Sequence, residues 1–408
     1  MKKRVVVSGG GLVSALGNDW ESCLAGLKAC KNFVRRMDEW DRYEKMNTRL
    51  AAPVDFIFPD LPRQKIRGMG RVARLAITAV DLALKQSNFS DSPELTNSRC
   101  GVSFGSSMGS VESLLDFYSM LVHDDIRKMT STTYVKAMPQ TCAANIAVFY
   151  GLTGRLISAN TACTSGSQAI GYAFETIKNG IQDIMISGGA EELSAADSAV
   201  FDTLFAASCK NETPQLTPRA YDKNRDGLVI GEGAGCLILE EYEHAIKRGA
   251  KIYAEIAGFA TNTDGTHITK PNRLTMASVM RSALDDAKIS AENIAYINMH
   301  GTATQSGDEA ESLATFDVFK DKVPVSTIKN YIGHTLGACG AIEAWLSINM
   351  MNEKWFAPNI NFTQLDPACA ELDYITADGR NIDGEYIMSN NFAFGGVNTS
   401  LIFKKIAV

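Results

Sequence analysis

The sequence lacks an excess of basic residues, a long apolar run and any paired-cysteine motif. Its 40 lysines and arginines are outnumbered by 46 aspartates and glutamates, which leaves a net charge of −6. A nucleic-acid-binding protein needs a basic face to neutralise phosphates, so this balance argues against one. No stretch approaches the roughly 18 consecutive apolar residues of a membrane-spanning helix. We therefore expect neither a nucleic-acid partner nor a membrane span.

Metal and redox motifs are missing as well. The nine cysteines form no CxxC pair and the five histidines lack metal-site spacing. There is no Walker A or HExxH sequence, and the glycines at 9–11 are no dinucleotide-binding loop because Ser14 replaces the third glycine. Ser8 and these glycines interrupt the apolar start at once, which predicts a strand and a turn rather than a signal peptide. Unpaired cysteines are typical of a reducing compartment, so we expect a cytoplasmic protein.

Short apolar runs alternate with longer segments of helical periodicity, and this alternation predicts an α/β fold. Strands are expected at Arg4–Val7, Arg155–Ala159, Asp183–Ser187, Cys236–Glu240, Tyr253–Ala257, Ala295–Met299, Val323–Thr327, Tyr386–Ser389 and Thr399–Phe403. Helices are expected at Met69–Gln86, Ser165–Asn179, Thr275–Ala287, Asp308–Phe319 and Leu336–Met351.

The order of these elements is similar in two parts of the chain. In each part a strand leads to a chemically reactive residue and a helix, then to a second strand and a glycine-rich segment. This pattern predicts two halves, 1–249 and 250–408, in which Cys163 and His334 hold equivalent positions and meet at a shared centre. A chance similarity between α/β units is the alternative.

Cys163 is the candidate nucleophile. It lies among small residues, at 160–167, between a predicted strand and a predicted helix, where the backbone turns sharply. Free N–H groups at a helix start would lower the pKa of the thiol and stabilise an oxyanion formed on a thioester. The alternative is a buried, inert cysteine, which we expect for each of the other eight.

Two histidines follow predicted strands in the second half. His300 stands at the carboxyl end of a strand, where α/β proteins bind ligands, with Thr302 and Thr304 beside it. His334 precedes a helix start rich in small residues, and the ammonium group of Lys329 would keep its imidazole neutral. A neutral imidazole donates a hydrogen bond to a developing oxyanion, but a structural role is the alternative for each histidine.

The glycine-rich turn at 390–398 carries Phe392 and Phe394. A mobile apolar gate fits this segment. A hairpin with two core phenylalanines fits it as well, and the local pattern favours the hairpin.

Together these segments resemble the β-ketoacyl-acyl-carrier-protein synthases of the type II, elongating kind, within the thiolase superfamily. The similarity extends over essentially the whole chain and implies a layered α-β-α-β-α thiolase-like fold and a homodimer. It rests on Thr161-Ala-Cys163-Thr-Ser-Gly, Gly188-Gly-Ala-Glu191, His300-Gly-Thr-x-Thr, Lys329 with Gly333-His334, and Asn391-Phe-x-Phe-Gly-Gly, in this order.

Such enzymes load an acyl chain from acyl-carrier protein onto a cysteine and condense it with malonyl-carrier protein by decarboxylative Claisen chemistry. The resemblance implies that Cys163 is the acylated nucleophile and that His300 and His334 stabilise the enolate, with Lys329 supporting His334. It also implies that the backbone N–H groups of Cys163 and Phe394 form the oxyanion hole.

Further residues follow from the same resemblance. Phe392 and Phe394 resemble the family's gate. Thr302 and Thr304 would contact the phosphopantetheine arm, which belongs to the carrier protein, so no cofactor bound by the enzyme itself is expected. The remaining implied residues comprise an acyl pocket (Met108 and Phe201), a structural monovalent cation site (Asn298, Glu343, Ser389 and Asn390) and a basic stretch suited to an acidic carrier protein (Arg63, Lys65, Arg67, Arg71 and Arg74). A solvated helix face is the alternative for the basic stretch.

Departures from the family pattern occur at Tyr331 and Ile332, before the Gly-His motif, and at Ala393, between the gate phenylalanines. They bear on chain preference and gate mobility rather than on the chemistry. With these departures the chain resembles ketosynthases of specialised polyene pathways, which pair with a cysteine-less chain-length factor. A heterodimer is therefore an alternative to a homodimer. A degradative thiolase with Cys339 as base is a second alternative. A non-catalytic chain-length factor is a third, and the intact Cys163 argues against it.

Overall fold

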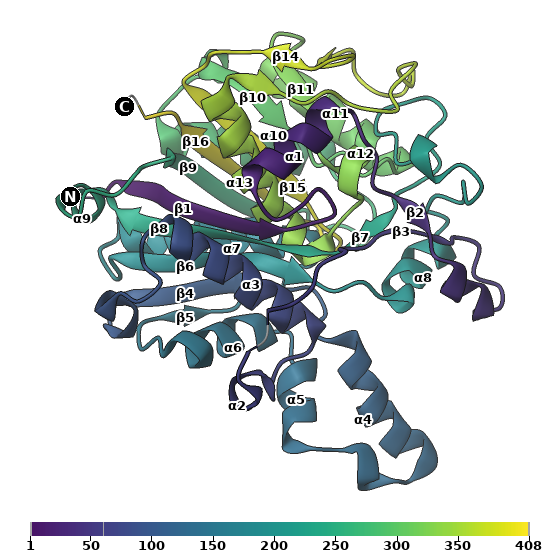
Figure 1. Cartoon of the computed structure of the whole chain (residues 1–408). Coiled ribbons are helices and arrows are strands. Elements are labelled where there is room, and N and C mark those ends of the chain that lie inside the picture. Colours follow the sequence, from purple (N-terminus) through teal and green to yellow (C-terminus); the bar gives the residue numbers. More distant parts are fainter. Residues whose placement is uncertain (1, 60, 407–408) are drawn as a thin grey trace.

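The computed structural model describes residues 2–59 and 61–406 (Figure 1). The described strands are β1 (Val5–Val13), β2 (Arg35–Arg36), β3 (Leu50–Ala52), β4 (Cys100–Gly105), β5 (Leu156–Ile157), β6 (Ile184–Glu191), β7 (Ile230–Gly231), β8 (Gly233–Glu241), β9 (Ala254–Thr263), β10 (Ile294–Asn298), β11 (Pro324–Ser326), β12 (Trp355–Phe356), β13 (Asp373–Tyr374), β14 (Arg380–Asn381), β15 (Tyr386–Phe392) and β16 (Val397–Lys404).

The described α-helices are α1 (Trp20–Lys28), α2 (Arg63–Ile66), α3 (Arg71–Gln86), α4 (Val111–His123), α5 (Ser131–Ala137), α6 (Thr141–Tyr150), α7 (Ser165–Lys178), α8 (Ala195–Thr203), α9 (Tyr242–Lys247), α10 (Arg273–Ala287), α11 (Gln305–Phe319), α12 (Lys329–Ile332) and α13 (Cys339–Glu353). Two short 3-10 turns, η4 (Ala162–Thr164) and η7 (Leu336–Ala338), lead directly into α7 and α13.

Eleven of the described strands form one mixed sheet in the order β13-β11-β10-β15-β16-β9-β1-β8-β6-β4-β5. This order contains the same arrangement twice. The first set lies in the sheet in the order β5-β4-β6-β8-β1, and the second in the order β11-β10-β15-β16-β9. If the strands of each set are numbered 1 to 5 along the chain, both orders read 3-2-4-5-1. The antiparallel pairing of β1 with β9 joins the two sets.

The helices form layers on both sides of these strand sets. α7 packs against β4, β6 and β8 on one side and β9 and β16 on the other, and α13 contacts β6, β8 and β15. α3 and α6 cover the outside of the first set, and α10, with α11 packed on it, covers the outside of the second (Figure 1). The layers therefore run helix, strand, helix, strand, helix, and the expected thiolase-like fold is confirmed.

The central position of α13 explains its composition. All of its residues from Cys339 to Met351 are buried, as expected for a helix that is covered on every side. Cys163 and His334 lie in or next to the turns that lead into the two central helices, so this layer helps to position the site.

The glycines at 9–11 do not form the predicted turn. They continue β1 to Val13 because helices approach both faces of this strand. A Cβ atom on Gly10 would overlap the Trp345 ring of α13, and one on Gly11 would overlap the Ala79 carbonyl of α3.

All the predicted strands and helices are present, with ends shifted by a few residues. The sequence analysis missed β4, the short strands β2, β3, β7, β12, β13 and β14, and the helices α1, α2, α4, α5, α6, α8 and α12. Of these, α4 and α5 project from the body of the molecule (Figure 1). Among the described residues, no helix has the length and apolar character needed to cross a membrane.

Candidate active site

Cys163 lies in η4, at an abrupt turn of the backbone. Ala162 has a φ of 50°, in the left-handed region that a residue with a side chain rarely adopts. The Thr164 and Ser165 hydroxyls donate to the carbonyl oxygens of Thr161 and Ala162 at 2.8 and 2.7 Å. These hydrogen bonds hold the turn and place Cys163 at the entry to α7.

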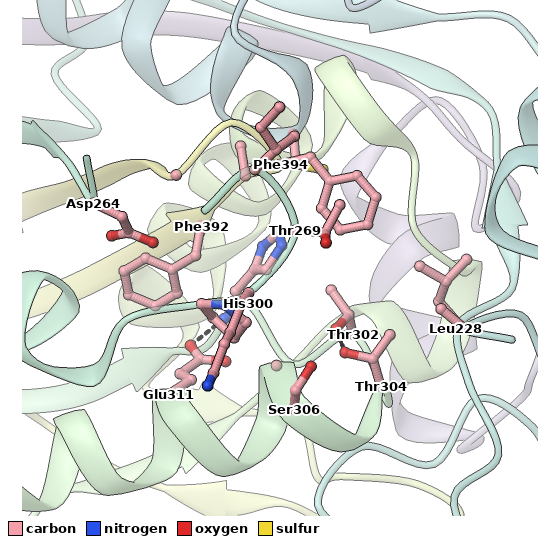
Figure 2. Close-up of a pocket in the computed structure, with 18 of the residues that line it drawn as sticks. Leu228, Asp264, Thr269, His300, Thr302, Thr304, Ser306, Glu311, Phe392 and Phe394 are labelled. Carbon is pink, nitrogen blue, oxygen red and sulfur yellow. Dashed lines mark hydrogen bonds between the residues drawn. The ribbon is translucent and has the colours of Figure 1, made fainter. Parts of the chain in front are cut away.

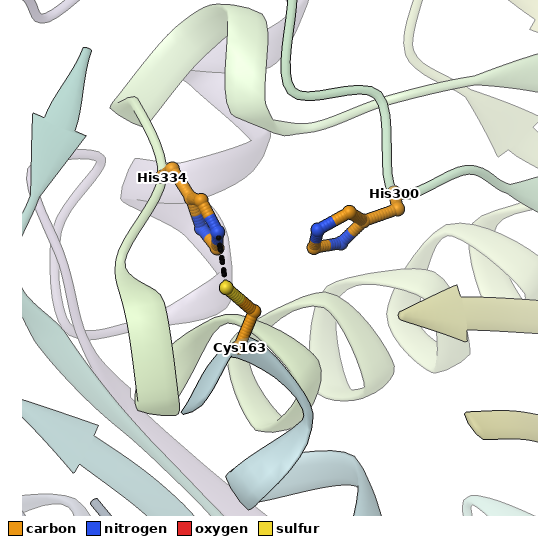
Figure 3. A group of neighbouring side chains, drawn as sticks. All are labelled: Cys163, His300 and His334. Atoms are coloured by element: carbon orange, nitrogen blue, oxygen red, sulfur yellow. Dashed lines mark hydrogen bonds between the residues drawn. The ribbon is translucent and has the colours of Figure 1, made fainter. Parts of the chain in front are cut away.

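The structure brings Cys163 together with both candidate histidines (Figure 3). The Cys163 Sγ atom lies 3.0 Å from His334 Nε2. The rings of His300 and His334 are nearly perpendicular, with centroids 5.1 Å apart. One ligand atom of each of the three residues lies within 4.8 Å of the others, and all three residues are buried.

Backbone and amide donors determine the tautomer of each histidine. The Leu336 N–H donates to His334 Nδ1 at 3.3 Å, and the Asn391 amide nitrogen lies 3.4 Å from His300 Nδ1 and donates to it. A neutral imidazole that accepts at Nδ1 carries its proton on Nε2. Each histidine therefore offers an Nε2–H as a donor, and that of His334 faces the sulfur.

Both imidazoles are neutral at pH 7. Burial lowers the pKa of His300 and of His334 well below the usual histidine range, and the positive charge of Lys329 lowers both further. The predicted effect of Lys329 on His334 therefore extends to both rings. Neutral imidazoles in a buried site are hydrogen-bond donors that need no reorganisation when charge develops.

Lys329 and Glu343 form a buried ion pair, with the Lys329 Nζ donating to Glu343 Oε1. Burial alone would lower the pKa of Lys329, but Cys339 and Glu343 raise it above its ordinary value, so the ammonium group is retained. Asn391 and Asn298 donate to the other carboxylate oxygen at 2.8 and 3.3 Å.

The four residues predicted to hold a structural cation divide between two faces of the sheet. Asn298, Glu343 and Ser389 are contiguous, since the Asn298 amide reaches Glu343 and the Ser389 hydroxyl, each at 3.3 Å. The Asn390 side chain instead contacts Met280 of α10, on the outer face. Three of the four predicted side chains therefore form one cluster. The carboxylate of this cluster, that of Glu343, is already neutralised by Lys329.

The predicted lowering of the Cys163 pKa is wrong for the resting enzyme. Burial raises the pKa of the thiol to about 11. Lys329 and the backbone N–H groups of Phe394 and Cys163 act in the opposite direction without outweighing burial. The sulfur is therefore a protonated thiol at rest, and the same donors are in place to stabilise negative charge at the reacting centre.

The two phenylalanines of the turn between β15 and β16 have different surroundings (Figure 2). Phe392 is buried, with its ring centroid 6.1 Å from that of His300. Phe394 is partly exposed, and its ring centroid lies 5.2 Å from that of Phe201. The segment is therefore a hairpin in which both phenylalanines line the pocket, Phe392 from a core cluster and Phe394 from a partly exposed position.

A pocket of about 250 Å³ opens onto these side chains. Thr302 and Thr304 line it, with their hydroxyl oxygens 2.9 Å apart (Figure 2). Phe201 lines it as predicted. Met108 does not: its side chain is 42% exposed, and its backbone N–H donates to Glu191 at 3.4 Å.

Several functional contacts were missed from the sequence. Glu311, on α11, accepts hydrogen bonds from the backbone N–H groups of His300 and Gly301 at 2.6 and 2.8 Å and so fixes the loop that carries His300. Asn391 was recognised only as part of a motif, and its amide orients His300. No local sequence signal marks Glu311, because a carboxylate on a helix is usually solvated.

The basic stretch is less uniform than predicted. Arg63, Lys65 and Arg67 are exposed. Arg71 instead pairs with the buried Glu232, with 2.7 Å between Nη2 and Oε1. The Arg74 guanidinium covers the Phe58 ring at 4.1 Å. The first three residues are the exposed ones, although the Lys65 Nζ donates to the Phe149 carbonyl oxygen at 3.4 Å and lies 4.6 Å from its ring centroid.

The predicted equivalence of Cys163 and His334 is also wrong. Each central helix is preceded by a 3-10 turn whose first residue has positive φ, Ala162 in one case and Leu336 in the other. Aligning these turns pairs Cys163 with Gly337. His334 lies three residues earlier, and it reaches Cys163 because the two turns pack together.

Comparisons with known proteins agree with this geometry. The model of the N-terminal domain of β-ketoacyl synthases matches residues 2–245, and the model of the C-terminal domain matches residues 253–363. The chain is 36% identical over 407 residues to 3-oxoacyl-[acyl-carrier-protein] synthase 1 of Haemophilus influenzae, with 99% of each chain covered.

Solved structures give the same result. A β-ketoacyl synthase from Burkholderia phymatum STM815 is 54% identical, with a TM-score of 0.98 over 99% of this chain and 100% of that one. The ishigamide ketosynthase/chain length factor is 29% identical, with a TM-score of 0.89 over the whole of both chains. The chain with the buried Cys163, His300 and His334 therefore belongs to the β-ketoacyl synthase family and is an acyltransferase.

Proposed function

We propose that the enzyme condenses an acyl chain held on Cys163 with malonyl-acyl-carrier protein to give β-ketoacyl-acyl-carrier protein. The observation that carries this proposal is the contact between Cys163 Sγ and His334 Nε2, with His300 on the far side of the same pocket. A nucleophile and two neutral donors in one buried site provide what the two half-reactions need. The curated relative named above is likewise named for acyl-carrier protein.

In the first half-reaction, Cys163 takes the acyl chain. Its sulfur attacks the thioester carbonyl, and the backbone N–H groups of Cys163 and Phe394 stabilise the oxyanion. The carbon–sulfur bond to the carrier's phosphopantetheine then breaks. The Cys163 proton passes to that leaving sulfur overall, so no permanently ionised thiolate is required, in agreement with a pKa of about 11.

In the second half-reaction, the bond between the malonyl carboxylate and the adjacent carbon breaks and releases carbon dioxide. The electron pair forms an enolate on the malonyl thioester, whose oxygen accepts hydrogen bonds from His300 and His334. The enolate carbon then attacks the acyl group on Cys163, and the cysteine leaves and is reprotonated. Lys329 keeps both imidazoles neutral, so that each acts as a donor rather than as an acid.

Purified enzyme tests this proposal directly. Incubation with acyl- and malonyl-carrier proteins should yield the β-ketoacyl product, and intact-protein mass spectrometry should detect the acyl group on Cys163. Absence of product with every chain length, or full activity in Cys163→Ala, would refute it. Cys339→Ser is the matched control, because Cys339 is the buried neighbouring thiol that a degradative thiolase would use as its base.

Thr302 and Thr304 are the proposed contacts of the phosphopantetheine arm, since both line the pocket. Arg63, Lys65 and Arg67 are the proposed docking residues for the acidic carrier protein, supported by their exposure and positive charge. Reversal of these three charges should raise the KM for carrier-bound substrates and leave the kcat unchanged.

The proposed assembly is a dimer, either of two copies or with a chain-length factor. The second possibility is supported by the similarity to the ishigamide ketosynthase/chain length factor. The mass of the purified enzyme in solution separates the two, because the chain alone forms a stable dimer only in the first case.

The proposal has three further parts, which concern the division into halves, a bound cation and the location of the enzyme. A division into halves at 249/250 is supported by the repeated strand order. A monovalent cation near Asn298 and Ser389 is supported by the Asn298 Oδ1 atom, which is buried without a partner in the described part of the chain. A cytoplasmic location is supported by nine cysteines that are all free thiols.

A further inference from the structure

One face of α8 borders the pocket through Phe201. Phe201 of this helix lines the pocket and packs against Phe394. Asp197 and Ser198 precede Phe201 by four and three residues, which places them on the same face of the helix. Both are buried, with 5% and 1% of their surface exposed.

These two polar side chains have no partner. Within residues 2–59 and 61–406, Asp197 Oδ2 and Ser198 Oγ are buried and accept or donate no hydrogen bond. Neighbouring acids differ: Glu191 accepts from the N–H groups of Ser107 and Gly337 at 2.8 and 3.0 Å, and Glu192 from that of Val72 at 2.9 Å. A buried polar atom left without a hydrogen bond is destabilising, so two of them one turn from a pocket residue call for a hydrogen-bonding partner.

Asp197 lies near the two buried acids at the end of β6, Glu191 and Glu192. Burial and the charges of Glu191 and Glu192 raise its pKa to about 7, an effect that requires these groups to be close. Glu191 in turn binds the backbone of Met108. Leu193, just before α8, packs against the cluster that contains Cys163 and also lines a second cavity of about 720 Å³. Asp197 and Ser198 lie one helical turn from Phe201 on the same face of α8, so a chain that continues past Phe201 along this face would reach them.

We propose that Asp197, together with Ser198, determines acyl-chain specificity by hydrogen bonding to a hydroxyl or keto oxygen carried on the chain. An alkyl chain of equal length leaves both polar groups unpaired and is disfavoured for that reason. This inference rests on the proposed function, because it needs an acyl chain on Cys163. A purely structural role for Asp197, as an acid in the first turn of α8, would change stability but not the choice of substrate.

Competition between matched substrates tests the inference. The kcat/KM is measured for octanoyl-carrier protein and for hydroxyoctanoyl-carrier proteins that carry the hydroxyl on successive carbons. In the wild type, at least one hydroxylated chain should be preferred by about tenfold. Asp197→Leu should abolish this preference and raise the kcat/KM for the octanoyl chain, whereas Asp197→Asn, which keeps a hydrogen-bonding group, should retain the preference.

Asp202→Asn is the matched control. Asp202 is a buried acid on the same helix, but it already accepts from the Asn47 N–H at 2.8 Å, so its replacement should leave the substrate ratio unchanged. An unchanged substrate ratio in soluble, folded Asp197→Leu overturns the inference. Loss of the preference in Asp197→Asn, or a wild type that prefers no hydroxylated chain, also overturns it. If the wild type makes no β-ketoacyl product from any carrier, the proposed function itself fails, which is a distinguishable result.

Discussion

The turns that precede the two central helices have nearly the same backbone but different chemistry. η4 begins at Ala162, with a φ of 50°, and η7 begins at Leu336, with a φ of 45°. In the first turn the next residue is Cys163, whose side chain faces the pocket. In the second it is Gly337, whose N–H donates to Glu191 at 3.0 Å. One turn therefore presents a nucleophile, and the other binds the two strand sets together.

The second strand set contributes its chemistry from other positions. His300 follows β10, His334 precedes η7, and Lys329 and Glu343 lie on either side of that turn. The covalent step thus depends on the first set, and the stabilisation of charge depends mainly on the second. Single substitutions can test this division of roles between the two strand sets.

The largest effect is expected from Cys163→Ala. Loss of the nucleophile should reduce condensation by about a thousandfold or more. Decarboxylation of malonyl-carrier protein should persist, because the two imidazoles belong to the other strand set. Release of carbon dioxide and formation of β-ketoacyl product are measured on the same samples. Loss of both activities together would mean that the two sets do not act separately.

Removal of one imidazole should produce the converse result. His300→Ala and His334→Ala should each slow malonyl decarboxylation by about a hundred- to a thousandfold, because an oxyanion donor is lost. Acylation of Cys163 should be affected much less in His300→Ala, since the sulfur contacts His334. Rapid-quench mass spectrometry of the acyl-enzyme checks the distinction, and equal acylation defects in the two variants would contradict it.

Lys329→Met should change both the pH profile and the stability. Lys329 helps to lower the pKa of both histidines, so its removal raises both values. Neutral imidazoles are lost as the pH falls through the pKa, and the acidic limb of the decarboxylation profile should therefore move to higher pH. The unpaired Glu343 should also lower the free energy of unfolding by about 3–5 kcal/mol.

A double variant separates these two effects of Lys329. Lys329→Met combined with Glu343→Gln removes the buried charge and should recover stability, while the acidic limb stays at the higher pH. Recovery of the original profile would show that the ion pair, and not the ammonium charge, controls the histidines. Thermal unfolding and the pH profile of decarboxylation are the two measurements.

The smallest effect is expected at the strained residues themselves. Ala162→Gly should raise the free energy of unfolding by at most about 1 kcal/mol, because glycine adopts positive φ freely. Leu336→Gly should lower it by about 2–3 kcal/mol, because Leu336 is a buried member of the hydrophobic cluster around Cys163. Denaturant unfolding of both variants measures the two changes in the free energy of unfolding. A change of the same sign in both would contradict the expectation that strain dominates at Ala162 and apolar burial at Leu336.

The residues that meet in the candidate active site could be predicted because each lies in a short motif next to a strand or a helix start. Cys163, His300, His334 and Lys329 were found in this way, as were the two phenylalanines of the hairpin. The strand alternation likewise predicted an α/β fold, since buried strands and amphipathic helices leave a local pattern. The layered arrangement was implied by the resemblance to the family.

The remaining features depend on contacts between distant residues. β4 was missed because its glycine and serine residues give little strand signal, although burial in the sheet selects small side chains there. Arg71 could not be separated from the docking stretch, since its partner Glu232 is 161 positions away. The pairing of Cys163 with Gly337 needed the backbone angles at Ala162 and Leu336, which motif order does not reveal.

Asn391 connects the hairpin to the residues that stabilise charge in the site. Its amide contacts His300 and Glu343, and the same strand continues through Phe392 into the turn that bears Phe394. Any displacement of this hairpin large enough to move the amide also releases the ring of His300. The position of the hairpin, the orientation of one imidazole and the hydrogen bonding of the buried carboxylate are thus coupled through a single amide group.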